Sequence, residues 1–141
     1  MDYRKHGDTY IVRLGVGDEI CASMTALAEK EKIALAEVSG IGAVNAFTVG
    51  VYDTAKKKYY ANEFSGAYEI VSLSGNITQK DGKPYLHLHF SAGNAAGAVF
   101  GGHLNSAVIS ATAEIFVRTL CGAVGRRFDG GIGLNLLDFE K

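Results

Sequence analysis

Three of the four histidines lie in one short segment of this 141-residue chain. His87 and His89 alternate with apolar residues in the run YLHLHF at positions 85–90, and His103 follows a pair of glycines. In a β-strand, alternate side chains point to the same side, so His87 and His89 would project together, away from Leu88. Their Cα atoms would lie roughly 6.6 Å apart at about 3.3 Å per residue.

This spacing predicts a metal site. Imidazole nitrogens bind zinc at about 2.0–2.1 Å, and two rings on one strand face can tilt onto one ion. His103 is far enough along the chain to return as a third ligand, so we expect His87, His89 and His103 to hold zinc or another divalent metal. For any one of these residues alone, a solvated side chain is the simpler interpretation, but the set of three favours the metal. His6 has no such partners and is interpreted as incidental.

Composition indicates an ordinary globular domain. The chain has 48% apolar and 21% charged residues, which is typical of such proteins, and its length predicts a single domain over residues 1–141. The 14 basic and 15 acidic residues give a net charge of −1, without the basic face expected of a protein that grips nucleic acid. Direct DNA binding therefore has little support from charge.

Targeting and cysteine patterns favour a cytoplasmic protein. The first residues form no apolar signal-peptide core, and no apolar run approaches the roughly 20 residues of a membrane span. Cys21 and Cys121 form no C-x-x-C motif and lie in apolar surroundings. We expect both to be buried free thiols, which suits a reducing compartment.

Local patterns indicate many strands and one helix. Residues 9–14 alternate as a strand, and apolar residues at helical spacing predict a helix capped by Asp18 that ends near Ile33. Asp81-Gly82 predicts a hairpin into the histidine-bearing strand. The other expected elements are bulged strands across 35–53, strands at 58–64 and 68–77, a glycine-rich loop at 91–102, a strand at 106–120 and a last strand at 134–139 that closes the sheet.

The segment 106–120 decides the fold class, because it could be mistaken for a helix. Its apolar residues recur with period two, which is typical of a strand. They are Ala107, Ile109, Ala111, Ala113, Ile115 and Val117, and they alternate with Ser110, Thr112, Glu114 and Arg118. We therefore predict an α+β fold with a largely antiparallel or mixed sheet of about seven strands and few helices.

Two sequence blocks carry a family resemblance. The run GAYEIVSLSGNI at 66–77 resembles the G-R-F-E-I-L-S-L-S-G motif of the PPC (plants and prokaryotes conserved) domain, with Ala67 in place of the arginine. Residues 87–104 and 112–115 are similar to the second block of its bacterial members. The resemblance implies this α+β fold in a homotrimer, a DNA-binding role, and a metal-binding pattern in which the three histidines take part. The AT-hook core R-G-R-P, which accompanies the domain in plant members, does not occur in this chain.

Two functions remain open. The first is a trimeric PPC-type regulatory module, associated with DNA or with other proteins, that carries a zinc site. The second is a small metal-dependent enzyme, a hydrolase or lyase, because three histidines leave the fourth position of a tetrahedral zinc for water. Glu114 is the candidate general base, although a solvated or salt-bridged role competes. Arg126-Arg127 either binds an anion or pairs with Asp129, and the pairing is the favoured interpretation.

Overall fold

The computed structural model describes residues 1–140, which contain eight strands and one helix. All strand pairings in this part of the chain are antiparallel, which confirms the predicted α+β class. The elements are β1 (Asp2–His6), β2 (Thr9–Gly15), α1 (Ile20–Lys30), β3 (Ala36–Asp53), β4 (Lys58–Lys80), β5 (Lys83–Gly93), β6 (Val99–Thr119), β7 (Gly125–Asp129) and β8 (Leu134–Asp138).

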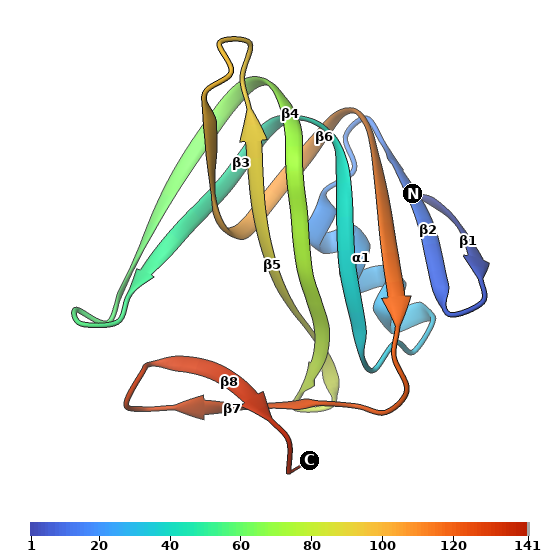
Figure 1. Cartoon of the computed structure of the whole chain (residues 1–141), viewed down its shortest axis with the longest axis vertical. Coiled ribbons are helices and arrows are strands. Elements are labelled where there is room, and N and C mark those ends of the chain that lie inside the picture. Colours follow the sequence, from blue (N-terminus) through green and yellow to red (C-terminus); the bar gives the residue numbers. More distant parts are fainter. Residues whose placement is uncertain (141) are drawn as a thin grey trace.

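The main sheet closes on itself at β5 and β6 (Figure 1). Its strand order is β1-β2-β6-β3-β4-β5, and β5 also pairs with β6, so β3, β4, β5 and β6 form a ring. β6 takes part in two ways because it is long: residues 99–103 pair with β5, while residues 103–119 pair with β3. The ring therefore closes at the start of β6, where the third histidine lies.

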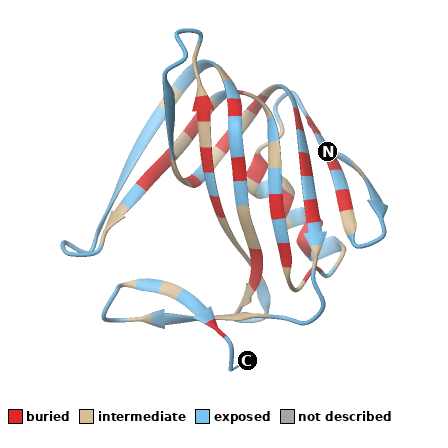
Figure 2. Cartoon of the chain, viewed as in Figure 1, coloured by how far each residue is buried: buried red, intermediate tan, exposed pale blue. Residues whose placement is uncertain are grey.

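The core follows the predicted alternation (Figure 2). In β5, Leu88, Phe90 and Ala92 are buried, whereas His87 and His89 point to the other side. The predicted face of β6 is buried except at Ala111. Between residues 109 and 113, β6 advances by four residues while the paired β3 advances by only two. Ala111 therefore lies in a bulge and does not follow the alternation.

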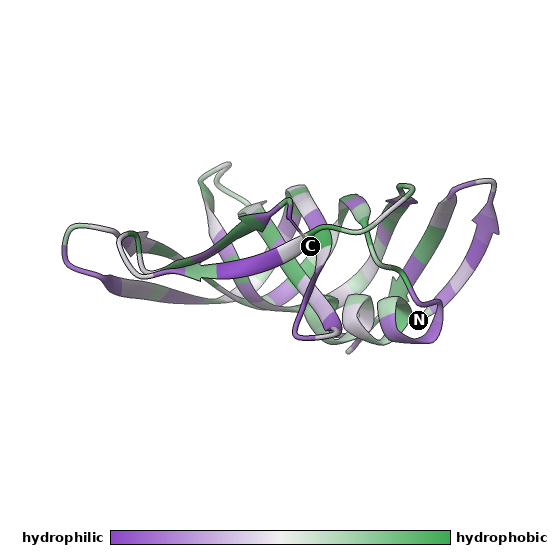
Figure 3. Ribbon diagram, turned by 90° about the horizontal axis from the view of Figure 1, so that it is seen from below, coloured by the Kyte–Doolittle hydropathy of each residue, from purple (hydrophilic) through white to green (hydrophobic). Residues whose placement is uncertain are grey.

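Helix α1 forms a layer on one side of the sheet (Figure 3) and packs against β5 and β6. Its buried stripe is the predicted one: Ile20, Met24, Leu27 and Ala28. The N-cap is Glu19 rather than Asp18, because the Glu19 carboxylate accepts the N–H groups of the first turn, while Asp18 accepts that of Gly15. At 11 residues, this helix of the described chain is too short to span a bilayer.

Several strands are longer than predicted. The Asp81-Gly82 turn forms the expected hairpin, with φ of 52° and 76°, as a type I′ turn requires. The segments 58–64 and 68–77, however, are parts of one strand, and the predicted loop at 91–102 shrinks to a turn at 94–98. Asn94 closes that turn by accepting the N–H groups of Ala96 and Ala98. β3 runs unbroken through two bulges, so the glycines bend these strands rather than ending them.

The C-terminal segment does not close the main sheet, contrary to the prediction for 134–139. β8 pairs with β7 as a separate two-stranded hairpin, and hydrogen bonds from Arg126 to Asn76 and Thr78 hold this hairpin against β4. β1 was not predicted, since its sequence DYRKH lacks apolar alternation.

The cysteines differ from each other in burial. Cys21 is half-buried on α1, whereas Cys121 is exposed, which corrects the expectation of two buried thiols. β6 ends at Thr119, so Cys121 lies in the connection to β7 and no longer shares the strand alternation.

Candidate metal centre

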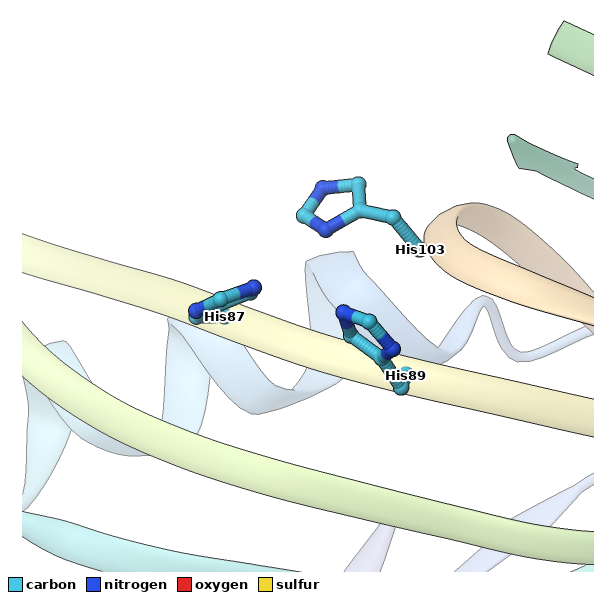
Figure 4. Close-up of side chains that lie close together, drawn as sticks. All are labelled: His87, His89 and His103. Carbon is cyan, nitrogen blue, oxygen red and sulfur yellow. The ribbon is translucent and has the colours of Figure 1, made fainter. Parts of the chain in front are cut away.

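The three predicted histidines meet at the closing point of the ring (Figure 4). His87 and His89 lie on β5 two residues apart, and His103 lies on β6 directly opposite His89. Opposed residues on antiparallel strands have Cβ atoms about 4.5–5.5 Å apart. The short turn at 94–98 and the antiparallel register therefore bring His103 to the other two.

The geometry of the three rings fits one ion. The ring centroids of His87 lie 5.3 Å from those of both His89 and His103, and the His89–His103 separation is 5.8 Å. Each histidine has a nitrogen within 4.8 Å of a nitrogen on the other two. A tetrahedral zinc with bonds of about 2.0–2.1 Å needs its ligand nitrogens about 3.4 Å apart. The side chains would rotate toward one another to close that difference.

Burial favours the neutral form of two of these histidines. Loss of solvent lowers the pKa of both His87 and His103, and the positive charge of Arg126 lowers the pKa of His87 further. A histidine binds metal through its neutral imidazole. At neutral pH these two side chains are therefore in the form that binds.

Two glycines allow the strands around the histidines to approach closely. Gly75 of β4 lies opposite Leu88 with φ of 156°, and a Cβ there would collide with the carbonyl oxygen of His87. A Cβ on Gly102 would lie 2.6 Å from the carbonyl oxygen of Gly50 in β3. The positions of His87 and His103 thus depend on the absence of a side chain on the neighbouring backbone.

A cavity of about 790 Å³ opens over the histidines. The three histidines and Arg126 line it together, which brings the histidine cluster and an arginine into one space. Its apolar wall comes from β3 and β8, and several neutral polar side chains complete it. These residues are Val51, Tyr52, Leu134, Leu136 and Leu137, and Tyr59, Asn76, Tyr85, Asn105 and Asn135.

The sequence did not single out these neutral residues. Tyr59 donates to Asn105 Oδ1 at 2.6 Å and to the carbonyl oxygen of His103 at 3.3 Å, and its ring meets that of His103 edge-on. Tyr85 alone carried a pattern that could have found it, because it shares a strand face with His87. The others reach the cavity through pairings between distant strands, which no local pattern reveals.

The other candidates from the sequence lie apart from the histidines. Glu114 is exposed on β6, in register with Arg13 and Ile41, and does not line the cavity. The β3 partners of His103 and Glu114, Gly50 and Ile41, are separated by roughly 30 Å of extended strand. His6 is exposed on β1, which β2 separates from the ring.

Arg126 does not pair with Asp129, contrary to the favoured interpretation. Its guanidinium donates to Asn76 Oδ1 at 2.8 Å and to Thr78 Oγ1 and the carbonyl oxygen of Asn135 at 3.0 Å each. Asp129 instead accepts the N–H of Ile132 within the turn between β7 and β8. Since side chains alternate along β7, Arg126 faces the main sheet, and Arg127 stays exposed with only a 3.9 Å contact to Glu140.

Comparison with solved structures shows close likeness over nearly the whole chain. A candidate DNA-binding protein from Bacteroides thetaiotaomicron is 31% identical, with a TM-score of 0.96 over 99% of this chain and 98% of its own. A metal-containing protein from Archaeoglobus fulgidus is 38% identical, with a TM-score of 0.87 over 96% of this chain and 97% of its own. A plant- and prokaryote-conserved protein from Pyrococcus horikoshii is 35% identical, with a TM-score of 0.84 over 96% and 93%.

Family comparison agrees with these structures. No curated protein sequence matches the chain significantly. The model of the Plants and Prokaryotes Conserved (PCC) domain, the PPC domain named above, matches residues 1–121. That span includes all three histidines and the whole closed ring, and leaves only the β7–β8 hairpin outside. The chain therefore belongs to the Plants and Prokaryotes Conserved domain family.

Proposed function

We propose that this protein is a metal-binding regulatory member of its family, in which His87, His89 and His103 hold one divalent ion. The observation that carries the proposal is the convergence of three imidazole nitrogens within 4.8 Å of one another. The lowered pKa values of His87 and His103 support it, because they keep these ligands neutral. So does the 38% identity to a protein from Archaeoglobus fulgidus described as metal-containing.

Zinc is the metal that we propose. Three neutral imidazoles without thiolate or carboxylate suit zinc and its neighbours among the divalent transition metals, rather than magnesium or calcium. A tetrahedral zinc with three protein ligands keeps a fourth position for water or a ligand. Here that position would face the cavity shared with Arg126.

We further propose that the protein acts as a homotrimer. A small apolar patch supports assembly: Val71 and Val99 lie side by side next to Gly93, and both are more than half exposed. Exposed apolar clusters of this kind commonly mark subunit contacts. Similar structures are described as candidate DNA-binding proteins, but the net charge of −1 argues against direct DNA binding. A DNA role would then run through a partner or a patch formed between subunits.

A small metal-dependent enzyme is the second candidate, because the cavity at the histidines has the size of a small-molecule site. A hydrolase or lyase also needs a group that moves a proton. No aspartate or glutamate is among the residues that line this cavity in the described chain, and Glu114 lies elsewhere. For this reason the binding and regulatory role comes first.

Elemental analysis of untagged protein, purified without chelator, tests the proposal. We expect about one zinc per chain, and none after His87→Ala and His89→Ala together. His6→Ala is the matched control, since it removes an exposed histidine on β1 and should leave the metal content unchanged. Protein that takes up no zinc, cobalt or nickel even on titration, or a double variant that keeps its metal, would contradict the proposal.

A further inference from the structure

Arg126 lies beside the proposed metal centre. Its guanidinium stacks 4.9 Å above the ring of Tyr85, which shares one face of β5 with His87 and His89. It also donates to Asn76, which lies directly opposite His87 in the pairing of β4 with β5. The arginine is thus held next to the first histidine by two independent contacts.

The charge of Arg126 has no acidic partner among the described residues. None of the ion pairs within residues 1–140 includes it. Its three hydrogen-bond acceptors, on Asn76, Thr78 and Asn135, are all neutral. Each of these acceptors takes one N–H: Thr78 from Nε, Asn135 from Nη1 and Asn76 from Nη2. A guanidinium carries five N–H groups, so one N–H on Nη1 and one on Nη2 remain free to donate.

A half-buried cation in this position favours an anion. Burial lowers the pKa of Arg126, which shows that the surroundings oppose its charge, although an arginine stays protonated in proteins. Two N–H groups on adjacent terminal nitrogens match the two oxygens of a carboxylate. A divalent ion on the histidines would add positive charge on the same side of the cavity.

The cavity also selects the rest of the ligand. One wall is apolar, with Val51 from β3 and Leu134, Leu136 and Leu137 from β8. Phosphate-rich ligands are usually held by several cations or by a helix N-terminus. The lining contains neither a lysine nor a residue of α1, and Arg126 is its one arginine in the described chain.

We propose that this cavity binds a small monocarboxylate with an apolar body, its carboxylate held between Arg126 and the metal centre and its body against the β8 leucines. The inference rests on the proposed metal site and names the class of ligand that the site takes. The hairpin of β7 and β8 supplies the arginine and the leucines of the apolar wall, so it acts as the ligand-recognition element of the domain.

The test uses the full-length chain with its zinc content measured by elemental analysis. Calorimetric titration compares benzoate and hexanoate with benzamide and hexanamide, which keep the apolar body and lose the charge, and with phenyl phosphate. We expect one or both carboxylates to bind at least about tenfold more tightly than their amides, the size of one charge-assisted interaction. Arg126→Gln should weaken carboxylate binding about tenfold or more without changing the zinc content. Arg127→Gln, which changes the exposed neighbour, should leave both unchanged.

Arg126 also anchors the β7–β8 hairpin, so its replacement by glutamine could unfold that hairpin. Arg126→Lys serves as a second variant, because it keeps the positive charge but loses the paired N–H donors of the guanidinium. If Arg126→Gln does not fold, weaker carboxylate binding by Arg126→Lys with normal zinc content supports the inference. Zinc-loaded protein that binds neither carboxylate at millimolar concentration, or that binds them equally well in the Arg126 variants, overturns it and leaves the metal site standing. Tighter binding of phenyl phosphate than of benzoate overturns the choice of carboxylate. Protein that holds no metal overturns the proposed function itself.

Discussion

His89 of β5 lies directly opposite His103 of β6, at the end pair of the ladder that joins these two strands. His103 pairs on its other side with Gly50 of β3. Closure of the sheet and assembly of the histidine cluster are therefore the same structural event. Any change that opens the ring at this point should also separate the three histidines.

Gly75→Ala should test this coupling. The new Cβ would collide with the backbone of His87, at a φ that alanine rarely adopts, so we expect a loss of about 1–3 kcal/mol or more in the free energy of unfolding. Urea denaturation measures that loss, and zinc titration should show weaker binding in the folded variant. Gly15→Ala is the matched control, because a Cβ on Gly15 meets nothing within 4 Å. Equal stability of the two variants would show that β4 and β5 are not so tightly apposed.

Acidification should destabilise the metal-free protein. Burial holds the pKa of His87 and His103 in the folded state below the ordinary value of about 6.5 that applies to the unfolded chain. Between these values the unfolded state binds more protons, so the free energy of unfolding falls as the pH falls. Urea denaturation of chelator-treated protein should give lower stability at about pH 5 than at about pH 7.5. The difference should shrink in His103→Gln, and stability that rises on acidification over this range would contradict the assigned burial.

The two cysteines should differ sharply in reactivity. Burial, aided by the negative charge of Glu19, raises the pKa of the Cys21 thiol to about 12, whereas Cys121 is exposed. Since the thiolate is the reactive form, Ellman's reagent should titrate one fast thiol per folded chain and a second only after denaturation. Cys121→Ser should abolish the fast phase and Cys21→Ser should keep it. Two equally fast thiols in the native protein would show that α1 leaves Cys21 open to solvent.

The oligomeric state should depend on the apolar patch around Val71. Sedimentation equilibrium should give three times the chain mass of 15.0 kDa for the unchanged protein. Val71→Glu places a charge at a side chain that is already 56% exposed, so the single chain should fold but the trimer should dissociate. Val16→Glu alters a side chain that is 74% exposed in the turn after β2 and should leave the trimer intact. A concentration-independent monomer of the unchanged protein would contradict the trimer.

Duplex DNA should bind weakly or not at all to the isolated protein. Phosphate affinity comes from clustered lysine and arginine, and a trimer would only triple a net charge of −1. Fluorescence anisotropy with mixed and A·T-rich duplexes at about 0.15 M salt measures this directly. A submicromolar affinity that persists at this salt concentration would instead make direct DNA binding the leading function.

The sequence by itself determined the local part of this structure. Alternation of apolar residues placed His87 and His89 on one strand face away from Leu88, and the period of two in residues 106–120 identified a strand rather than a helix. Asp81-Gly82 located the hairpin because only a few residues adopt both left-handed conformations of a type I′ turn. Each of these inferences depends on side-chain direction or backbone preference within a few residues.

Tertiary structure decided what depends on register between distant strands. The placement of His103 against His89 follows from ring closure, and that of Arg126 follows from the way the β7–β8 hairpin docks on β4. Glu114 is exposed to solvent near one end of β6, while the cavity lies near the other end of that strand. The glycines of residues 35–53 indicated bulges, but not where the register shifts or by how much, so sequence spacing alone could not show which polar residues would meet.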